Sequence, residues 1–577
     1  MQATIGSRVR FNAQKAYAIV LLAIGLALGW LGGELVFLGG SPYYLVCALL
    51  VIGAALLAWR GDRRAAWLYA TMLAITIVWA LWEAGLDGWA LMPRLAGPVV
   101  MGLWFLTPWS HNGPRRPTPA SGRLAAGTVA TLILALGAGV ALQFSAHSVA
   151  IAAGAPDTTS LGNGAQGSPD SDWTAYGRDQ GGQRFSPLGQ ITVENVGKLE
   201  PLWTYRTGFD AGETRSPFEA TPLKIADTLY LCTPASDIIA LDAETGRLRW
   251  RFNARADREM VAFAACRGVS YYKDPAAAAG AACAERILST SIDGRLFAVD
   301  TRDGKPCSGF GTDGAVDLKH GFGPVEKGYY YVTSAPLVMR GKVVLGGFIP
   351  DNQHLGAPSG VIRAYDAVTG KLGWAFDVGR PGQRGEPPAG STYTHDTPNS
   401  WGPISGDEAL GLVYLPTGNA TPDWYGGQRR SFDDEYSSSI LALEIDTGNE
   451  RWKFQTVHHD LWDYDVPAQP TLVDMPVGSV GVPALIQATK RGQIFVLDRR
   501  TGRPITPVVE RPVPQSNVPG ERTSPTQPYS VGMPNFAGPQ LTEKMMWGLT
   551  PIDQAWCRVM FRKSRVLGDM APPILGQ

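Results

Sequence analysis

The chain has 577 residues, and its 51 Lys and Arg residues balance its 51 Asp and Glu residues, so the formal net charge at pH 7 is zero. This balance excludes the basic surface of a nucleic-acid-binding protein, and the length allows more than one domain. Residues 1–145 are almost wholly apolar between short charged breaks, whereas the remainder is rich in Gly and Pro.

Five apolar runs within residues 1–145 predict a membrane domain of five transmembrane helices. Most runs approach the ~20 residues that a helix needs to cross the hydrocarbon layer, and Trp and Tyr gather at their ends as an interfacial belt. A cleaved signal peptide is a poor alternative, because the apolar pattern repeats. The runs are Ala16–Gly33, Leu35–Trp59, Ala65–Trp82, Leu95–Trp109 and Leu124–Phe144.

Basic residues mark every second connection between the runs. With basic loops inside, the N-terminus is predicted to be cytoplasmic, and everything after Phe144 lies outside the cytoplasmic membrane. The basic residues are Arg8, Arg10, Lys15, Arg60, Arg63, Arg64, Arg115, Arg116 and Arg123.

The six cysteines suit an oxidising compartment. Cys266 and Cys283 flank a short Ala-rich insertion and are predicted to form a disulfide. Cys47 lies within an apolar run, and the sequence gives no pairing for Cys232, Cys307 and Cys557. The chain has no C-x-x-C-H motif, so it offers no c-type haem attachment site.

A short polar tether and a repetitive region follow. Residues 146–172 are small and polar, which predicts a flexible linker. In residues 173–577 a strand, an acid, a tight turn ending in Gly and a second strand then recur five times, and in three copies a Trp ends the motif. The copies are Ala240–Trp250, Ala298–Lys305, Ala364–Trp374, Ala442–Trp452 and Val496–Pro504.

The spacing of these motifs predicts a β-propeller. Their glycines, at positions 246, 304, 370, 448 and 502, lie 54 to 78 residues apart, which suits four-stranded blades with insertions. The large Trp is expected to pack between neighbouring sheets. A large β-sandwich with accidental turn similarity is the alternative.

One segment, Trp452–Asp465, holds an unusual number of side chains that could take part in catalysis or bind a cofactor. It reads W-K-F-Q-T-V-H-H-D-L-W-D-Y-D and combines three acids and two histidines with aromatic rings. A cofactor pocket needs this mixture, but a polar loop with two indole rings plugging a β-structure fits the composition equally well. His458 and His459 are interpreted as a hydrogen-bonding scaffold, because adjacent strand residues face opposite ways.

These motifs, together with Asp172–Thr192 (D-W-T-A-Y-G-R-D-Q-G-G-Q-R-F-S-P-L-G-Q-I-T) and Leu202–Gly208 (L-W-T-Y-R-T-G), resemble the membrane-bound quinoprotein dehydrogenases of the glucose/quinate/shikimate family. The resemblance covers essentially the whole chain. It implies an eight-bladed periplasmic propeller, anchored in the bacterial inner membrane, that binds pyrroloquinoline quinone (PQQ). It also implies oxidation of a small sugar, polyol or cyclic hydroxy acid, with ubiquinone in the lipid bilayer as electron acceptor.

The resemblance also assigns site residues. Asp463, in the W-D step of H-H-D-L-W-D-Y-D, matches the catalytic base and metal neighbour. Lys490, in Ala488–Arg499, matches the basic residue that touches the carbonyl oxygens of PQQ, and Trp401, in N-S-W, matches the residue that stacks on its plane. Asn399 is a further cofactor contact.

The metal ligands in the same comparison are Asp351 and Asn352, in G-G-F-I-P-D-N, together with Asn419, in P-T-G-N-A-T-P-D, and Asp463. Asn419 also counts as a cofactor contact. Hard oxygen donors of this kind suit Ca²⁺ or Mg²⁺. Simpler interpretations remain open: a strand-end lysine at Lys490, a plain turn at Asp351–Asn352 and a core indole at Trp401.

Two departures bear on function. Ala235 stands where many glucose-oxidising relatives carry a histidine, which favours another polyol or a cyclic hydroxy acid. The sequence also predicts only about five to six blades, so either the chain is an apparently C-terminally truncated product or its last blades are supplied by another chain. Poor stability and little activity are expected of this chain alone. The alternatives are a non-catalytic propeller that binds partners and an inactive family member. Glu34, Glu83, Asp87 and Arg94 are quinone-site candidates, although interface anchoring explains them equally simply.

Overall fold

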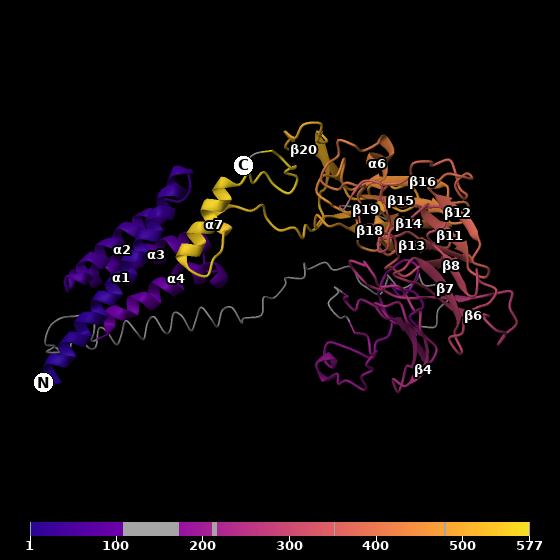
Figure 1. The fold of residues 1–577 in the computed structure, drawn as a ribbon, viewed down its shortest axis with the longest axis horizontal. Helices are drawn as coiled ribbons and strands as arrows, with labels where there is room; N and C mark the ends of the chain where they lie inside the picture. Colours follow the sequence, from indigo (N-terminus) through magenta and orange to yellow (C-terminus); the bar gives the residue numbers. More distant parts are fainter. Residues whose placement is uncertain are drawn as a thin grey trace. The chain divides into compact units, whose positions relative to one another are not determined.

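The computed structural model describes residues 2–107, 172–210, 216–350, 352, 354–477 and 480–575 (Figure 1). The described residues form two compact units. One contains the N-terminal helices and Pro539–Gly568, and the other is rich in β-structure and ends with Asp569–Leu575. Each unit is described on its own.

Four α-helices and a short 3₁₀ helix form the N-terminal part of the helical unit. Three stretches, Ala13–Phe37, Arg64–Ala84 and Gly88–Leu106, are long and apolar enough to cross a membrane, and Tyr43–Trp59 is apolar but shorter. The elements are α1 (Gln2–Phe37), α2 (Tyr43–Trp59), α3 (Arg64–Ala84), α4 (Gly88–Leu103) and η1 (Trp104–Leu106).

Two of the predicted runs have different boundaries in the structure. The run Leu35–Trp59 crosses a turn at Gly39, which adopts a φ of +73° between α1 and α2. The run Leu95–Trp109 begins inside α4, whose first turn is capped by the Asp87 carboxylate, which accepts a hydrogen bond from the Ala90 N–H at 3.1 Å. Hydropathy alone misses both boundaries, because the uncharged turn does not interrupt the first run, whereas the charged Arg94 inside α4 cuts the second run short. The run Leu124–Phe144 lies outside the described residues, as do residues 146–171 of the predicted linker.

A segment that follows the sheets in sequence belongs to the helical unit. It contains η5 (Glu543–Met545) and α7 (Pro551–Lys563). A capping box starts α7: the Thr550 hydroxyl accepts from the Asp553 N–H, and the Asp553 carboxylate accepts from the Thr550 N–H at 3.1 Å. Ala555 and Val559 of α7 are buried in the same apolar cluster as residues of α1 and α2.

The β-rich unit is built from antiparallel sheets whose strands follow one another in sequence. Its described residues contain four four-stranded sheets, one three-stranded sheet and one two-stranded ribbon. The first two sheets comprise β1 (Leu223–Ile225), β2 (Thr228–Cys232), β3 (Ile238–Asp242), β4 (Leu248–Phe252), β5 (Ser270–Lys273), β6 (Glu285–Thr290), β7 (Arg295–Asp300) and β8 (Ala315–Asp317).

The remaining sheets continue the same up-and-down order, which confirms the sheet-rich propeller architecture. They comprise β9 (Leu337–Met339), β10 (Lys342–Leu345), β11 (Ile362–Asp366), β12 (Leu372–Phe376), β13 (Ser405–Asp407), β14 (Leu412–Pro416), β15 (Ser439–Glu444), β16 (Glu450–Gln455), β17 (Thr471–Val477), β18 (Val480–Ala488), β19 (Ile494–Asp498), β20 (Val508–Pro512) and β21 (Thr526–Ser530). Two short helices, η4 (Val196–Lys198) and α6 (Ser431–Tyr436), complete the unit.

The repeated turns dock each blade on its neighbour. All five motif glycines have a φ between +68° and +71°. The Trp374 indole of β12 donates to the Ile445 carbonyl at 2.7 Å and lies against Gly448, where an added Cβ would meet the ring at 2.6 Å. Trp452 is placed in the same way against Arg499 and Gly502. The prediction that the motif Trp packs between sheets is confirmed.

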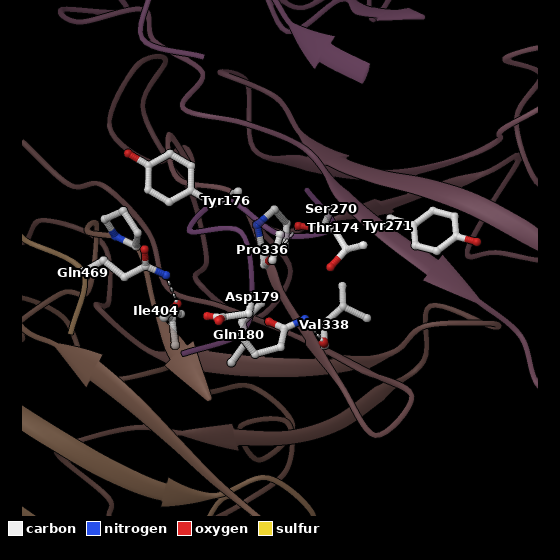
Figure 2. Close-up of a pocket in the computed structure, with 14 residues that line it drawn as sticks. Thr174, Tyr176, Asp179, Gln180, Ser270, Tyr271, Pro336, Val338, Ile404 and Gln469 are labelled. Carbon is white, nitrogen blue, oxygen red and sulfur yellow. Dashed lines mark hydrogen bonds between the residues drawn. The ribbon is translucent and has the colours of Figure 1, made fainter. Parts of the chain in front are cut away.

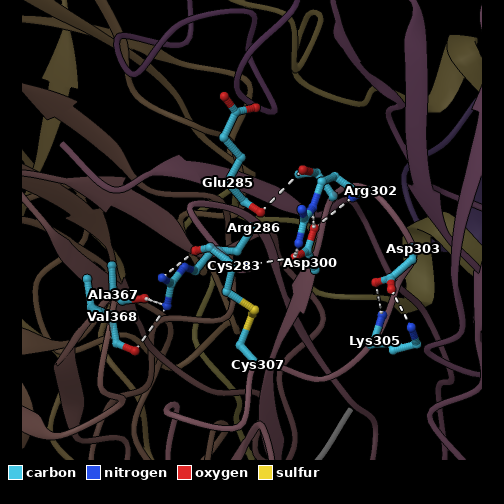
Figure 3. The surroundings of a disulfide bond; sticks show 11 residues. Cys283, Glu285, Arg286, Asp300, Arg302, Asp303, Lys305, Cys307, Ala367 and Val368 are labelled. Carbon is cyan, nitrogen blue, oxygen red and sulfur yellow. Dashed lines mark hydrogen bonds and ion pairs between the residues drawn. A yellow bond between two sulfur atoms is a disulfide. The ribbon is translucent and has the colours of Figure 1, made fainter. Parts of the chain in front are cut away.

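The cysteines pair differently from the prediction. The disulfides are Cys232–Cys266 and Cys283–Cys307, so the predicted Cys266–Cys283 bond is wrong. The reason is the strand layout: Cys232 ends β2 within the first sheet, whereas Cys283 precedes β6 and meets the turn after β7 (Figure 3). In the described residues Cys47 and Cys557 are free thiols.

Candidate active site

The loop after β16 carries three carboxylates, at Asp460, Asp463 and Asp465. Asp460 is fully buried and organises this loop: its carboxylate accepts hydrogen bonds from the backbone N–H groups of Trp462 and Tyr464, both at 2.8 Å. Burial raises the pKa of Asp460 above its usual range, although the hydrogen bonds to the carboxylate oppose the shift.

Asp463 lies in a strained backbone conformation at the exposed side of this loop. Its φ of +60° is in the left-handed region, which non-Gly residues adopt mainly where surrounding contacts impose it. The Asp463 carboxylate accepts a hydrogen bond from Lys490 Nζ at 2.7 Å, and 30% of its side chain is exposed. The structure therefore brings together the predicted base and the predicted basic residue.

Lys490 lies in the turn between β18 and β19 and keeps its charge. Partial burial lowers the pKa of Lys490, but the hydrogen bond to Asp463 and the negative charges of Asp465, Asp463 and Asp460 outweigh it, so the pKa is raised. The ammonium is therefore positioned to stabilise negative charge that develops beside Asp463.

The Asp465 carboxylate accepts hydrogen bonds from two of the other predicted cofactor residues, Trp401 and Asn419. One carboxylate oxygen accepts from the Trp401 indole N–H at 3.1 Å, and the other accepts from the Asn419 backbone N–H at 2.7 Å. Trp401 is thereby fixed by a charge-assisted hydrogen bond, which favours a defined orientation of its ring.

Side-chain oxygens of Asn399 and Asp465 pack closely around Gly418. The buried Asn399 Oδ1 has no hydrogen-bond partner among the described residues, which is costly unless a ligand satisfies it. A Cβ on Gly418 would lie 3.0 Å from Asp465 Oδ1 and 3.3 Å from Asn399 Oδ1. The unpaired amide oxygen and the carboxylate fit a hard cation such as Ca²⁺.

The other predicted metal ligands do not all lie beside Asn399 and Asp465. The Asn419 amide Nδ2 donates to the carbonyls of Asp423 and Asp460, and its Oδ1 accepts from the Ala420 N–H. Asn352 lies in an exposed turn, and Asp351 lies outside the described residues. No group of three or more His, Cys, Asp or Glu side chains among the described residues is arranged to hold a metal ion.

Arg267 adds a positive charge that the sequence did not indicate. Its guanidinium lies over the Trp401 ring, 5.3 Å from the centroid, and pairs with Glu219 at 3.2 Å. A nearby depression of about 330 Å³ is large enough for a small organic molecule. Its lining includes Arg267, Arg184, Tyr176, Pro467 and Ala488.

A second, narrow cavity is unsuited to a cofactor. Figure 2 shows it between Thr174, Gln180, Ser270 and Pro336, with Gln180 donating to the Val338 carbonyl at 2.8 Å. Its free space of about 20 Å³ suits a single water, and none of the predicted site residues lines it.

Both histidines make hydrogen bonds, as the scaffold interpretation expects, but they lie in the loop after β16 and not on a strand. His459 is buried between two carboxylates: its Nδ1 lies 2.7 Å from Asp434 and its Nε2 lies 3.1 Å from Glu521. His458 contacts Gln455 and Glu510. These contacts hold the start of the loop that carries Asp463.

The chain is similar in sequence to a known protein family and to several known proteins. A family described as glucose/ethanol/alcohol dehydrogenase, beta-propeller domain, PQQ, matches residues 173–577. The quinoprotein glucose dehydrogenase of Escherichia coli (strain K12) is 41% identical over 584 residues, covering 98% of this chain and 72% of that protein. The quinate/shikimate dehydrogenase (quinone) of Acinetobacter baylyi is 38% identical and covers 94% of this chain and 69% of that protein.

A further relative is the glycerol dehydrogenase large subunit of Gluconobacter oxydans, 47% identical over 409 residues, which cover 70% of this chain. The chain spans 55% of that subunit's length. Among solved structures, the quinohemoprotein alcohol dehydrogenase of Comamonas testosteroni has 25% identity and a TM-score of 0.48, covering 63% of this chain and 52% of that chain.

Proposed function

Because the chain belongs to the PQQ-dependent glucose/ethanol/alcohol dehydrogenase family of β-propeller oxidoreductases, we propose that it oxidises a polyol, sugar or cyclic hydroxy acid at the Asp463–Lys490 site and passes the electrons to ubiquinone. The observation that carries this proposal is the 2.7 Å contact between the Asp463 carboxylate and Lys490 Nζ, on a loop whose backbone is held in a left-handed conformation.

The residues around this pair fit the family's cofactor. Trp401 offers an aromatic face, with the guanidinium of Arg267 positioned to neutralise an anionic ligand on the same ring. Asn399 Oδ1 and Asp465 offer oxygen donors for a cation, and Asn419, Asp463 and the Asp351–Asn352 segment are the further proposed ligands. When bound, PQQ with Ca²⁺ or Mg²⁺ supplies an electrophilic ortho-quinone that accepts a hydride.

The chain's own residues supply the acid–base chemistry. Asp463, as a carboxylate, accepts the proton of the substrate hydroxyl. The Lys490 ammonium stabilises the negative charge that develops on a ligand oxygen next to it. Trp401, held by Asp465, limits how a flat ligand lies in the site, and Asp460 keeps the loop from relaxing away from Lys490.

The substrate class proposed first is a polyol. By the family resemblance, Ala235 stands where many glucose-oxidising relatives carry a histidine, and one relative, the glycerol dehydrogenase large subunit, is 47% identical over 409 residues. The proposed topology places the propeller in the periplasm and the helices in the inner membrane, where ubiquinone dissolves.

The test is a substrate screen in membranes that contain the full chain, reconstituted with PQQ and CaCl₂. Glycerol, inositol, glucose, quinate and shikimate are offered in turn, and ubiquinone reduction is followed. We expect PQQ-dependent reduction with a polyol as the preferred substrate. Failure of the chain to bind PQQ in the presence of Ca²⁺ would overturn the proposal and favour a non-catalytic binding propeller.

A further inference from the structure

Helix α7 buries two polar side chains beside the apolar Ala555 and Val559, and it exposes two large apolar side chains in its middle turns. Its fully buried positions include the polar residues Gln554 and Arg558, whereas Trp556 and Met560 are 55% and 44% exposed. Because residues four apart share a helix face, Trp556 and Met560 form one outward apolar ridge. Exposing an indole while burying a guanidinium is unfavourable if the outward face meets water, and it is favourable if that face meets lipid.

The buried polar side chains of α7 have their partners near the ends of α2 and α3. The Arg558 guanidinium pairs with Glu83 near the end of α3, and Glu83 also pairs with Arg94 of α4 at 2.7 Å. The Tyr44 hydroxyl of α2 donates to Gln554 Oε1 at 2.8 Å. These contacts bury the polar groups of α7 against protein and leave its apolar ridge outside.

In the part of the chain that the structure describes, the ion pairs and polar contacts of Pro539–Gly568 with α1, the turns and α4 lie at one end of the helices. Lys563 pairs with Glu34 near the end of α1 at 2.6 Å, and the Ser41 N–H in the α1–α2 turn donates to Glu543 at 3.0 Å. The Trp547 indole donates to the Trp89 carbonyl at the start of α4 at 2.8 Å. The segment therefore covers the end that holds the α1–α2 and α3–α4 turns.

The exposed apolar surface of the segment continues that of the spanning helices. Trp82, Leu86 and Trp89, around the α3–α4 turn, are 62–82% exposed. Beside them the segment exposes further large apolar side chains, namely Leu541, Met545, Trp547 and Leu549. The segment has five basic residues against two acidic ones, and because Arg558 and Lys563 pair with Glu83 and Glu34 of the other helices, a small positive excess is left for anionic headgroups.

We propose that Pro539–Gly568 is an interfacial membrane anchor, with the Trp556–Met560 ridge of α7 lying at the headgroup–acyl boundary of the leaflet that contains the α1–α2 and α3–α4 turns. The partner is the lipid bilayer itself. Sequence that follows the propeller strands is thereby part of the membrane-facing unit, and the inference rests on the helical unit alone, so it is independent of the proposed catalytic function.

The test places nitroxide labels on the full chain in lipid nanodiscs that contain anionic lipid. Trp556→Cys and Met560→Cys are compared with Trp30→Cys, 77% exposed on α1, and with Leu248→Cys, 50% exposed on β4, all in a Cys47→Ala, Cys557→Ala background. Collisions with membrane-soluble O₂ and with a water-soluble nickel complex are measured. We expect a several-fold preference for O₂ at positions 556 and 560, as at position 30, and the reverse preference at position 248.

Two results overturn the proposal: water-type accessibility at positions 556 and 560, or exclusion of both reagents, which would mean that protein covers the ridge. A measurement on the unsubstituted chain guards against misfolded variants. A carbene reagent dissolved in the bilayer should label the tryptic peptides Met545–Arg558 and Val559–Arg562 as it labels Ala16–Arg60, and should leave the propeller peptide Leu372–Arg384 unlabelled. Labelling confined to Ala16–Arg60 would contradict the anchor.

Discussion

Three carboxylates of one loop have three different surroundings, and this difference assigns their roles. Asp460 is fully buried and accepts hydrogen bonds from the loop's own backbone, so it shapes the loop. Asp465 is 5% exposed, and its two carboxylate oxygens accept hydrogen bonds from Trp401 and Asn419. Asp463 is the most exposed and pairs with Lys490, so it is the carboxylate best placed to exchange a proton with a substrate.

Asp460→Ala should destabilise the β-rich unit, because it leaves the buried N–H groups of Trp462 and Tyr464 without an acceptor. The expected loss is about 2–4 kcal/mol, which is read as a lowered apparent Tm in a thermal melt. Asp446→Ala is the matched control: Asp446 is 60% exposed, and its ion pair with Arg340 should contribute little. Equal melting temperatures of the two variants would argue against the role of Asp460.

Lys490→Met should lower kcat by roughly 10²-fold while PQQ remains bound, because the variant loses the charge beside Asp463. Lys490→Arg should recover part of the loss. Since the pKa of Lys490 is raised, its ammonium stays charged throughout neutral and mildly alkaline pH. The wild-type rate should therefore not fall with the titration of Lys490 between pH 7 and 10. A wild-type kcat for Lys490→Met would rule out the electrostatic role.

At the scale of the element, several charged side chains surround the turn after β7 and the neighbouring Cys283–Cys307 disulfide (Figure 3). Asp300 is 4% exposed, accepts from the Cys283 and Arg302 N–H groups at 2.7 and 2.9 Å, and pairs with Arg302 at 2.8 Å. Burial alone would raise the pKa of Asp300, but these interactions outweigh it and lower the pKa to about 2.

Asp300→Asn should reduce the free energy of unfolding by about 2 kcal/mol at pH 7. A depressed pKa stabilises the folded state above the unfolded pKa near 3.9, so the difference should shrink as the pH falls from about 4 towards 2. Asp303→Asn is the control, because Asp303 is exposed and paired only with Lys305. Denaturant titrations over this pH range check the result, and a pH-independent difference would contradict it.

The docking of motif glycines on tryptophans gives a second prediction at this scale. Gly448→Ala should cost about 2–4 kcal/mol, because it combines a positive φ with a Cβ directed into the Trp374 ring. Gly356→Ala, with a φ of +85° and open space around the Cβ, should cost only the backbone term of about 1 kcal/mol. Thermal melts compare the two, and equal costs would mean that the Trp contact adds nothing.

The sequence predicted the elements better than the contacts between them. The turn motifs revealed the blades because their glycine, acid and Trp have local roles, and apolar runs revealed the helices. The disulfide pairs depend on which strand ends meet, and that order is not written in the spacing of the cysteines. Arg267 over Trp401 and Asp465 beneath Asn419 join segments that lie far apart in the chain, so no local pattern indicated them.

At the scale of the whole molecule, each of the two units is built from stretches that are not consecutive in sequence. The β-rich part is followed by Pro539–Gly568, which returns to the helical unit, and then by Asp569–Leu575 in the β-rich unit, where the Asp569 and Ala571 carbonyls accept from Tyr464 and Trp462. Hydropathy missed this return, because α7 is short and mixes polar and apolar residues on both its buried and its exposed faces. The loop that carries Asp463 is thus supported by sequence beyond the membrane-facing segment.

The most direct test of the central claim is a single-turnover measurement on the full chain loaded with PQQ and Ca²⁺. Bound PQQ is mixed rapidly with the preferred polyol, and its reduction is followed by absorbance in the wild type, Asp463→Asn and Asp465→Asn. If Asp463 is the base, Asp463→Asn should bind PQQ normally and reduce it about 10²–10⁴-fold more slowly. Asp465→Asn should chiefly weaken PQQ binding. Reduction at the wild-type rate in Asp463→Asn would contradict the account.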